Sequence, residues 1–276
     1  MKIYAFADES SANVDEQIQA MLRNGLDGLE IRNVDGVNVA DITEEKAYEV
    51  KAKMDAAGLT VWSVGSPIGK IEIGKESEHI EKFKHVLRVA KILGAANIRL
   101  FSLHIHDGRR PDECTEEVLS FLKKLLSLAE GSGVTLCHEN EKDIYGDVPE
   151  RCLIIHRTLP EIKAVFDPAN YIQCGADTKT AWELLKPYVK YLHIKDALPD
   201  GNVVPAGKGV GNLPAIIKEF TDMGGSAMTL EPHLHVFAGL AELESKGQNS
   251  IVGEVYSYAS NELAFDAAAA ALKELI

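Results

Sequence analysis

Four side chains that can bind a metal ion follow short apolar segments of this chain. They are Glu139, Asp167, His193 and Glu231, in the strings VTLCHEN, AVFDPAN, YLHIKD and AMTLEPH, at intervals of 28, 26 and 38 residues. Three carboxylates and one imidazole suit Mn²⁺, Mg²⁺ or Co²⁺ better than a thiolate zinc site would. A (β/α)₈ barrel repeats about every 30 residues, and its strand ends meet at one mouth. The spacing therefore predicts one divalent-metal site built from four distant residues.

Strand-like and helix-like segments alternate along the chain. β-rich runs are found at 2–7, 27–32, 59–64, 97–102, 133–138, 163–167, 189–194 and 226–231. Between them, apolar residues repeat at three- and four-residue steps, as in 78–93 and 116–129, and a final alanine-rich helix is expected at 262–275. Glycines separate the expected helices from the following strands, as αβ loops require. Because no linker-like stretch divides the chain, we predict a single α/β domain over 1–276, a (β/α)₈ TIM barrel.

An open, doubly wound sheet is the competing architecture. It would need a topological switch point and usually a glycine-rich first turn, but the first turn, ADESSANVD, has no glycine. In the favoured barrel, side chains alternate in and out along each strand. This alternation puts Asp167, His193 and Glu231 at the last or nearly last inward positions. The long segments 196–212 and 232–261 then belong to loops at the same mouth.

Composition limits the classes of partner. The 276 residues carry a formal charge of -13, whereas a nucleic-acid or anionic-membrane partner normally requires a basic face. No apolar run approaches the roughly 20 residues that span a bilayer, and the N-terminal MKIYAFADES has no secretory signal. The four cysteines show no CxxC spacing, as in reduced cytosolic proteins. We expect a soluble, cytoplasmic protein with a small-molecule substrate; homo-oligomerisation stays open.

The motifs also resemble a known family. HEN, FDPAN, HIKD and LEPH, in this order, are similar to motifs of the sugar phosphate isomerase/epimerase family, the xylose isomerase-like TIM-barrel group that includes ketose 3-epimerases and endonuclease IV. LEIRN (29–33) and GKGVGN (207–212) extend the resemblance. It implies one divalent ion, with Mn²⁺ favoured and Mg²⁺, Co²⁺ or Zn²⁺ as alternatives. It also implies that Glu139 and Glu231 exchange protons with substrate carbon, through a cis-enediolate of a keto-sugar, polyol or sugar acid. A metal-dependent sugar isomerase or epimerase is therefore expected.

Two positions depart from the 3-epimerase pattern. Asn170 stands where those enzymes have a histidine three residues after the metal-binding aspartate, and Lys195 lies in HIKD, where they carry an arginine a few residues after the histidine. We expect Asn170 to hydrogen-bond a sugar hydroxyl. Lys195 is expected to bind a hydroxyl, carboxylate or phosphate, or to stabilise an oxyanion; neutralisation of the carboxylates is its alternative role.

Other side chains are predicted to line the substrate pocket because they share strand ends or inward positions with the ligands. They are Phe6, Glu30, Arg32, Trp62, His104 and His233. For Arg32, pairing with Glu30 is the alternative, and the aromatic side chains could simply fill the barrel. The segment GKGVG (207–211) lacks the preceding strand and the GKS/T ending of a P-loop. We expect this segment to form a loop at the mouth of the barrel, with backbone amides that could donate hydrogen bonds to an anionic substrate.

Three rival functions stay open. The first is a dehydratase or lyase that uses the same enediolate on a keto-inositol or a 3-keto-glycoside. The second is an AP endonuclease-like enzyme, which the acidic charge and Asn170 disfavour. The third is a non-catalytic sugar-binding barrel.

Overall fold

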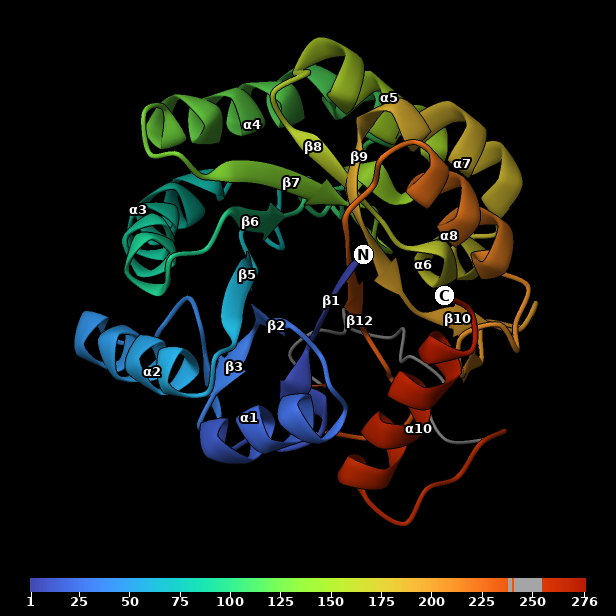
Figure 1. The fold of residues 1–276 in the computed structure, drawn as a ribbon. Coiled ribbons are helices and arrows are strands. Elements are labelled where there is room, and N and C mark those ends of the chain that lie inside the picture. Colours follow the sequence, from blue (N-terminus) through green and yellow to red (C-terminus); the bar gives the residue numbers. More distant parts are fainter. Residues whose placement is uncertain (238–239, 241–254) are drawn as a thin grey trace.

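A closed barrel of eight parallel strands forms the centre of the computed structural model, which describes residues 1–237, 240 and 255–276 (Figure 1). The strands follow the order β1-β12-β9-β8-β7-β6-β5-β2 around the barrel. They are β1 (Lys2–Ala5), β2 (Gly28–Ile31), β5 (Thr60–Gly65), β6 (Asn97–Leu100), β7 (Thr135–Glu139), β8 (Lys163–Phe166), β9 (Val189–Ile194) and β12 (Ala227–Leu230). Each overlaps one strand predicted from the sequence, so the predicted (β/α)₈ fold is confirmed.

Helices surround this barrel as an outer ring (Figure 1). They are α1 (Val14–Arg23), α2 (Glu44–Ala56), α3 (Glu76–Leu93), α4 (Thr115–Ala129), α5 (Pro149–Thr158), α6 (Pro168–Gln173), α7 (Thr178–Leu185), α8 (Leu213–Asp222) and α10 (Asn261–Lys273). Short 3₁₀ segments are η1 (Ala7–Glu9), η2 (Pro111–Cys114), η3 (Tyr145–Asp147) and η4 (Lys186–Tyr188). The predicted helices 78–93, 116–129 and 262–275 correspond to α3, α4 and α10. Among the described residues, no helix combines the length and apolarity that crossing a bilayer would require.

Local sequence explains where the helices begin and end. Asn13 caps α1, because its side-chain oxygen accepts hydrogen bonds from the backbone amides of Asp15 and Glu16. Gly94 ends α3 in the left-handed region, at φ 71°, a conformation that glycine adopts without steric cost. The apolar faces of the helices pack on the outer face of the barrel, where residues such as Val86, Ile98 and Leu122 are fully buried.

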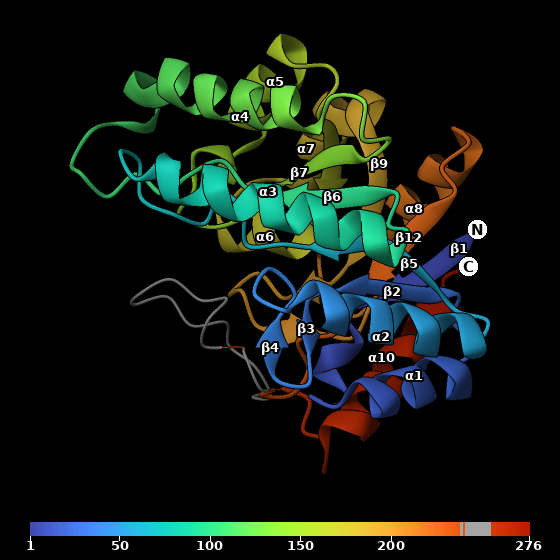
Figure 2. The same ribbon diagram turned by 90° about the vertical axis from the view of Figure 1, so that its left-hand side faces the viewer.

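The inside of the barrel is apolar at one end and charged at the other. The apolar layer consists of Tyr4, Cys137, Val165, Tyr191 and Ala227, with Trp62 packed against it. The Trp62 ring stacks on Tyr4, with centroids 5.1 Å apart. The amino ends of the strands and both chain termini lie on this side of the molecule (Figure 2). The charged layer lies toward the carboxyl ends, where the sequence places the predicted site.

Two register shifts and two hairpins were not visible in the sequence pattern. Strand pairing shifts between Leu29 and Glu30, so that Glu30 pairs with Ser63. It shifts again between Ala164 and Val165 on β8. Small antiparallel hairpins join β3 (Asn33–Val34) to β4 (Val37–Asn38) and β10 (Asp196–Ala197) to β11 (Val203–Val204). The second hairpin lies in the predicted loop 196–212, whereas the predicted loop 232–261 falls largely outside the described residues.

Candidate metal centre

The structure brings the four predicted ligands together at the carboxyl ends of their strands. Glu139 is the last residue of β7, His193 lies near the end of β9, and Asp167 and Glu231 directly follow β8 and β12. One ligand atom from each lies within 4.8 Å of the others, and all four residues are buried. Residues far apart in the sequence thus form one compact group of three carboxylates and one imidazole.

The two carboxylate oxygens of Asp167 differ in their hydrogen bonding. Oδ1 accepts the backbone N–H of Asn170 at 3.0 Å and so caps α6. Oδ2 is buried and accepts no hydrogen bond. The Asn140 side chain holds the Asp167 backbone from both sides: its Nδ2 donates to the Asp167 carbonyl at 2.9 Å and its Oδ1 accepts the Asp167 N–H at 3.0 Å. Helix capping and the asparagine of HEN therefore aim an unsatisfied oxygen into the cluster.

Two buried cations lie against these carboxylates. Arg99 Nη1 donates to Glu139 Oε2 at 2.8 Å. Lys195 Nζ lies 2.8 Å from Asp167 Oδ2, without the angles of a hydrogen bond, and donates to Glu231 Oε2 at 3.0 Å. The alternative role predicted for Lys195, neutralisation of the carboxylate cluster, is thus present in the structure.

The electrostatics of the cluster fit a bound cation. Burial, together with the charges of Glu231 and Glu139, raises the pKa of Asp167 to about 7 despite the opposing charge of Lys195. Burial lowers the pKa of His193, yet the charges of Glu139 and Glu30 hold it well above its ordinary value. Carboxylates that repel one another, and the buried Asp167 Oδ2, which accepts no hydrogen bond and interacts with Lys195 through charge alone, are what a divalent ion would neutralise. The residues therefore fit one hard divalent ion.

A second group of ligand-type atoms does not suit a second ion. Glu9, Glu231 and His233 approach one another closely, but the buried guanidinium of Arg32 already lies among them. Its Nη2 donates to Glu9 Oε1 at 3.1 Å and its Nη1 to Glu231 Oε1 at 3.4 Å, while Nε donates to Asp8 at 2.8 Å. A divalent ion there would face this fixed positive charge at low dielectric. Among the described residues, the geometry supports one ion.

Several residues predicted to bind substrate lie beside the cluster. Phe6 is fully buried under Arg32, whose guanidinium carbon is 4.4 Å from the ring centroid, and its ring meets His193 edge-on at 5.3 Å. Asn170 Nδ2 donates to the Asn140 carbonyl at 2.9 Å and to Glu139 Oε1 at 3.4 Å. The Asn170 amide nitrogen therefore holds Glu139. Arg32 pairs with Asp8, Glu9 and Glu231 instead of the suggested Glu30.

The remaining candidates take other positions. His233 Nδ1 lies 3.1 Å from Glu9 Oε1, at the edge of the cluster. Trp62 does not reach it, because its ring stacks on Tyr4 in the apolar layer. His104 Nδ1 contacts the Asp143 carbonyl at 2.9 Å and its ring stacks on His106. Neither interaction connects His104 to the four ligands.

Several charged residues of the charged layer were not predicted from the sequence. Arg99 is the main one: it lies in the middle of β6, between Ile98 and Leu100. A cation inside a short apolar strand is a signal that could have been used, since buried charges are normally paired. Glu9 and Asp8, by contrast, lie in η1 and gave no periodic signal.

The glycine-rich segment corrects one expectation. The backbone amides of Gly207, Gly209 and Gly211 donate to the Asp196 carboxylate at 2.9, 3.0 and 2.9 Å. The Ala197 amide donates to the same carboxylate at 2.9 Å. These amides are thus occupied by a side chain of the chain itself and are not offered to an anionic substrate. The segment fixes the backbone that follows Lys195.

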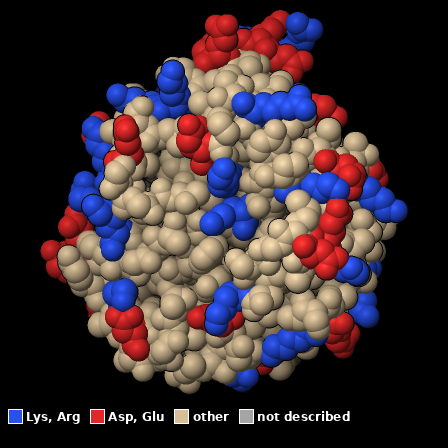
Figure 3. Space-filling view, turned by 45° about the horizontal axis from the view of Figure 1, so that its top comes forward, with Lys and Arg blue, Asp and Glu red and all other residues tan. Residues whose placement is uncertain are grey.

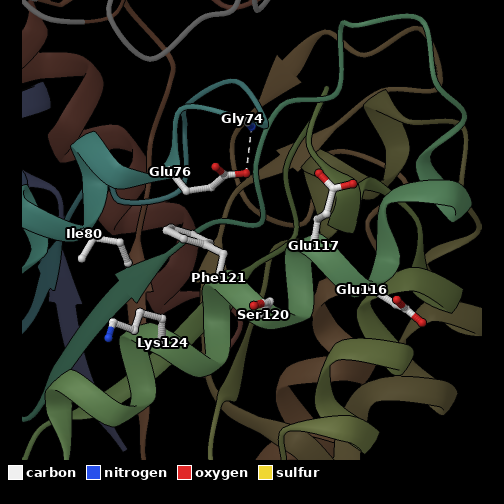
Figure 4. Close-up of a pocket in the computed structure, with 8 residues that line it drawn as sticks. All are labelled: Gly74, Glu76, Ile80, Glu116, Glu117, Ser120, Phe121 and Lys124. Carbon is white, nitrogen blue, oxygen red and sulfur yellow. Dashed lines mark hydrogen bonds between the residues drawn. The ribbon is translucent and has the colours of Figure 1, made fainter.

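Among the described residues, the outer surface has no comparable cluster of metal-binding side chains. A groove of about 550 Å³ lies between α3 and α4, outside the barrel (Figure 4). It is lined by Gly74, Glu76, Ile80, Glu116, Glu117, Ser120, Phe121 and Lys124. On the face that Figure 3 shows, basic and acidic side chains are interspersed among uncharged residues. The barrel interior therefore remains the candidate for chemistry.

The chain belongs to the family of xylose isomerase-like TIM barrels, whose model matches residues 18–251. The resemblance inferred from the motifs is thus confirmed. A comparison with curated proteins gave no match.

Solved structures share the fold over the full chain. A crystal structure of IolI protein with a binding zinc atom has a TM-score of 0.77 at 17% identity, covering 100% of this chain and 98% of that one. D-psicose 3-epimerase with D-tagatose, from Clostridium cellulolyticum H10, has a TM-score of 0.73 at 15% identity, covering 100% and 98%. The probable 3-DHS dehydratase AsbF from Bacillus anthracis has a TM-score of 0.73 at 16% identity, covering 99% of each chain. At these identities the likeness shows the fold, and epimerases and a dehydratase both occur on it.

Proposed function

We propose that this chain is a divalent-metal-dependent sugar isomerase or epimerase. The observation that carries the proposal is the convergence of four ligand-type residues at the mouth of a xylose isomerase-like barrel: Glu139, Asp167, His193 and Glu231. One of their oxygens, Asp167 Oδ2, is buried and accepts no hydrogen bond. The proposed substrate is a keto-sugar, polyol or sugar acid, and the proposed ion is Mn²⁺, with Mg²⁺, Co²⁺ or Zn²⁺ as alternatives. The zinc atom named for the IolI structure supports a metal on this fold. A cytoplasmic location stays a prediction.

The four ligands would hold the ion, and two of them, Glu139 and Glu231, would exchange the proton with a carbon of the substrate. A divalent ion bound there would polarise a carbonyl and its neighbouring hydroxyl, which acidifies the C–H bond next to them. Each of the two glutamates lies against one buried cation: Arg99 Nη1 is 2.8 Å from Glu139 Oε2, and Lys195 Nζ is 3.0 Å from Glu231 Oε2. One glutamate would remove the proton, and the other would serve the opposite side of the substrate.

Lys195 adds a positive charge where negative charge develops. Its ammonium group is buried between Asp167 and Glu231. A cation in such a site stabilises an oxyanion on the substrate more strongly than it would in water. We propose that Lys195 contacts the substrate oxygen that becomes an enediolate.

Deuterium exchange tests the reaction class directly. The protein would be incubated in D₂O with Mn²⁺ and a panel of keto-sugars, inososes and sugar acids, and products analysed by NMR and mass spectrometry. We expect solvent deuterium to enter one carbon with Mn²⁺ and not after chelation. Glu231→Gln should reduce exchange by about 100-fold or more, the usual size of a general acid–base contribution. Exchange that persists unchanged in Glu231→Gln and in Glu139→Gln would contradict the proposal.

Dehydration is the second candidate, because an acid and a base lie side by side. Lys195 Nζ is 3.0 Å from Glu231 Oε2, and β-elimination of water needs a base for the C–H and an acid for the leaving hydroxyl. A keto-inositol or a 3-keto-glycoside would be the substrate. The same assay separates the reactions, since isomerisation conserves the mass of the substrate, dehydration of a keto-inositol removes one water, and elimination from a 3-keto-glycoside releases the aglycone as an alcohol.

A further inference from the structure

Glu30 directly contacts the imidazole of the metal-site histidine. Its Oε2 lies 3.0 Å from His193 Nε2, and both side chains are completely buried. The other oxygen, Oε1, accepts the hydroxyls of Tyr191 at 2.7 Å and Ser63 at 3.1 Å. Because both oxygens face donors of the protein, Glu30 has little capacity left for a substrate, which was its predicted partner.

The two nitrogens of His193 face different surroundings. Nδ1 points into the cluster, 2.8 Å from Glu139 Oε1 and 3.3 Å from Glu231 Oε2. Nε2 points the other way, to Glu30. A neutral imidazole carries one proton, and its other nitrogen provides the lone pair for a metal ion. A carboxylate that accepts the Nε2 proton therefore leaves the Nδ1 lone pair directed at the ion.

The chain holds Glu30 in this position through the irregularity of the barrel. Pairing between β2 and β5 shifts after Leu29, so that Glu30 lies opposite Ser63 and skips Trp62. A bulge of this kind changes the direction of a side chain beside a functional site. Trp62 then packs in the apolar layer, while Ser63 Oγ reaches both Glu30 and the Tyr191 hydroxyl.

We infer that Glu30, supported by Tyr191 and Ser63, is a positioning residue that fixes the tautomer and orientation of His193 for metal binding. The inference rests on the proposed metal site and deepens it, since it concerns a residue behind the ligand. Replacing the carboxylate partner of a metal-binding histidine commonly lowers the metal affinity by about 10- to 100-fold. Glu30 thus acts on affinity through His193, without touching substrate.

Metal affinity is the decisive measurement, and it requires no substrate. Binding of Mn²⁺ would be measured by calorimetry for the wild type, Glu30→Gln and Tyr191→Phe. We expect Glu30→Gln to bind Mn²⁺ about 10- to 100-fold more weakly, and Tyr191→Phe about fivefold more weakly, as for one lost hydrogen bond. Tyr4→Phe is the matched control, because Tyr4 lies in the apolar layer beside Trp62 and should leave the affinity unchanged.

A spectroscopic measurement separates positioning from a general loss of structure. In ¹⁵N-histidine-labelled protein loaded with diamagnetic Zn²⁺, His193 of the wild type should show a protonated Nε2 and a metal-bound Nδ1. Glu30→Gln should lose that pattern while circular dichroism stays that of the wild type. If Glu30→Gln and Tyr191→Phe bind Mn²⁺ as tightly as the wild type, the inference is wrong. If the wild type itself binds no divalent ion, the proposed function fails instead.

Discussion

The ammonium nitrogen of Lys195 lies 2.8 Å from Oδ2 of Asp167, the one carboxylate oxygen of the cluster that accepts no hydrogen bond. The same nitrogen lies 3.0 Å from Glu231 Oε2. One lysine thus contacts two of the proposed metal ligands from inside the site. Its charge opposes a divalent ion and at the same time favours negative charge on a substrate, so the two effects of removing it should have opposite signs.

Replacing Lys195 by methionine should separate these effects. Two unit charges about 4 Å apart interact by about 4 kcal/mol at the effective dielectric of a protein, so loss of the cation should tighten Mn²⁺ binding by about tenfold or more. Turnover should fall by about 100-fold or more if Lys195 stabilises the enediolate. Calorimetry and the deuterium-exchange assay measure the two quantities. Lys190→Met is the control, because Lys190 Nζ lies over Trp62 at the other end of β9 and should change neither. Weaker metal binding in Lys195→Met would show that the lysine helps to build the site.

Replacing Arg99 by methionine should destabilise the metal-free protein. Arg99 is nearly completely buried and donates to Glu139 Oε2 at 2.8 Å. Breaking a buried pair leaves an uncompensated charge and typically costs about 3–5 kcal/mol. Urea unfolding in chelator-treated buffer measures the loss, and added Mn²⁺ should restore part of it, since the ion would neutralise Glu139. Arg110→Met, which removes an exposed pair with Glu113, should change the free energy of unfolding by less than about 0.5 kcal/mol.

The barrel and the convergence of the four proposed ligands could be predicted because both depend on periodic patterns. Strand-like runs at regular spacing define the (β/α)₈ fold, and a strand that ends at a carboxylate or histidine places that residue at the mouth. Asp167 and Glu231 directly follow β8 and β12. An error of one residue in a predicted strand end would therefore still have placed both side chains at the carboxyl ends of the strands. Such information is contained in the local sequence.

What surrounds the ligands depends on register and on tertiary contacts. Simple alternation put Trp62 at the mouth, but the shift after Leu29 brings Ser63 to the level of Glu30 instead. No property of the string TVWSVG indicates that shift. Asp196 likewise reads as a loop aspartate, and only the folded chain shows three glycine amides around its carboxylate. Whether such a bulge or loop forms depends on the energies of many contacts between residues that are far apart in the sequence.

Substitution of Gly209 should damage the loop behind Lys195. A Cβ at Gly209 would lie 2.3 Å from the Ala197 carbonyl oxygen and 2.4 Å from Asp196 Oδ1. The backbone must shift to accept it, so Gly209→Ala should lower the free energy of unfolding by about 1–3 kcal/mol, as overpacking does. Gly131→Ala is the control for backbone strain alone: its φ is +72°, and a Cβ there meets nothing within 4 Å. That variant should lose about 1 kcal/mol. A smaller loss in Gly209→Ala than in Gly131→Ala, or unchanged Lys195-dependent turnover in Gly209→Ala, would show that the loop tolerates the displacement.

Stability should fall in mild acid because of a buried histidine in α5. His156 lies in α5, where burial lowers its pKa to about 4 from an ordinary value of 6.5, although its contact with the Ile162 carbonyl at 3.1 Å opposes the shift. Well above pH 6.5 the residue is neutral in the folded and the unfolded chain, so it causes no pH dependence there. Between pH 6.5 and 4 the unfolded chain binds the proton and the folded chain does not, which favours unfolding as pH falls.

The contribution of His156 can be isolated by comparison with a variant that cannot titrate. A shift of this size corresponds to a loss of up to about 3 kcal/mol on going from pH 7 to pH 4. His156→Gln should therefore lose less stability than the wild type over this interval, while the difference between the two proteins stays constant above pH 7. Urea unfolding at pH 7.5, 7, 5.5 and 4.5 measures both curves. Parallel curves over the whole range would mean that His156 accepts its proton in the folded protein as readily as in the unfolded chain.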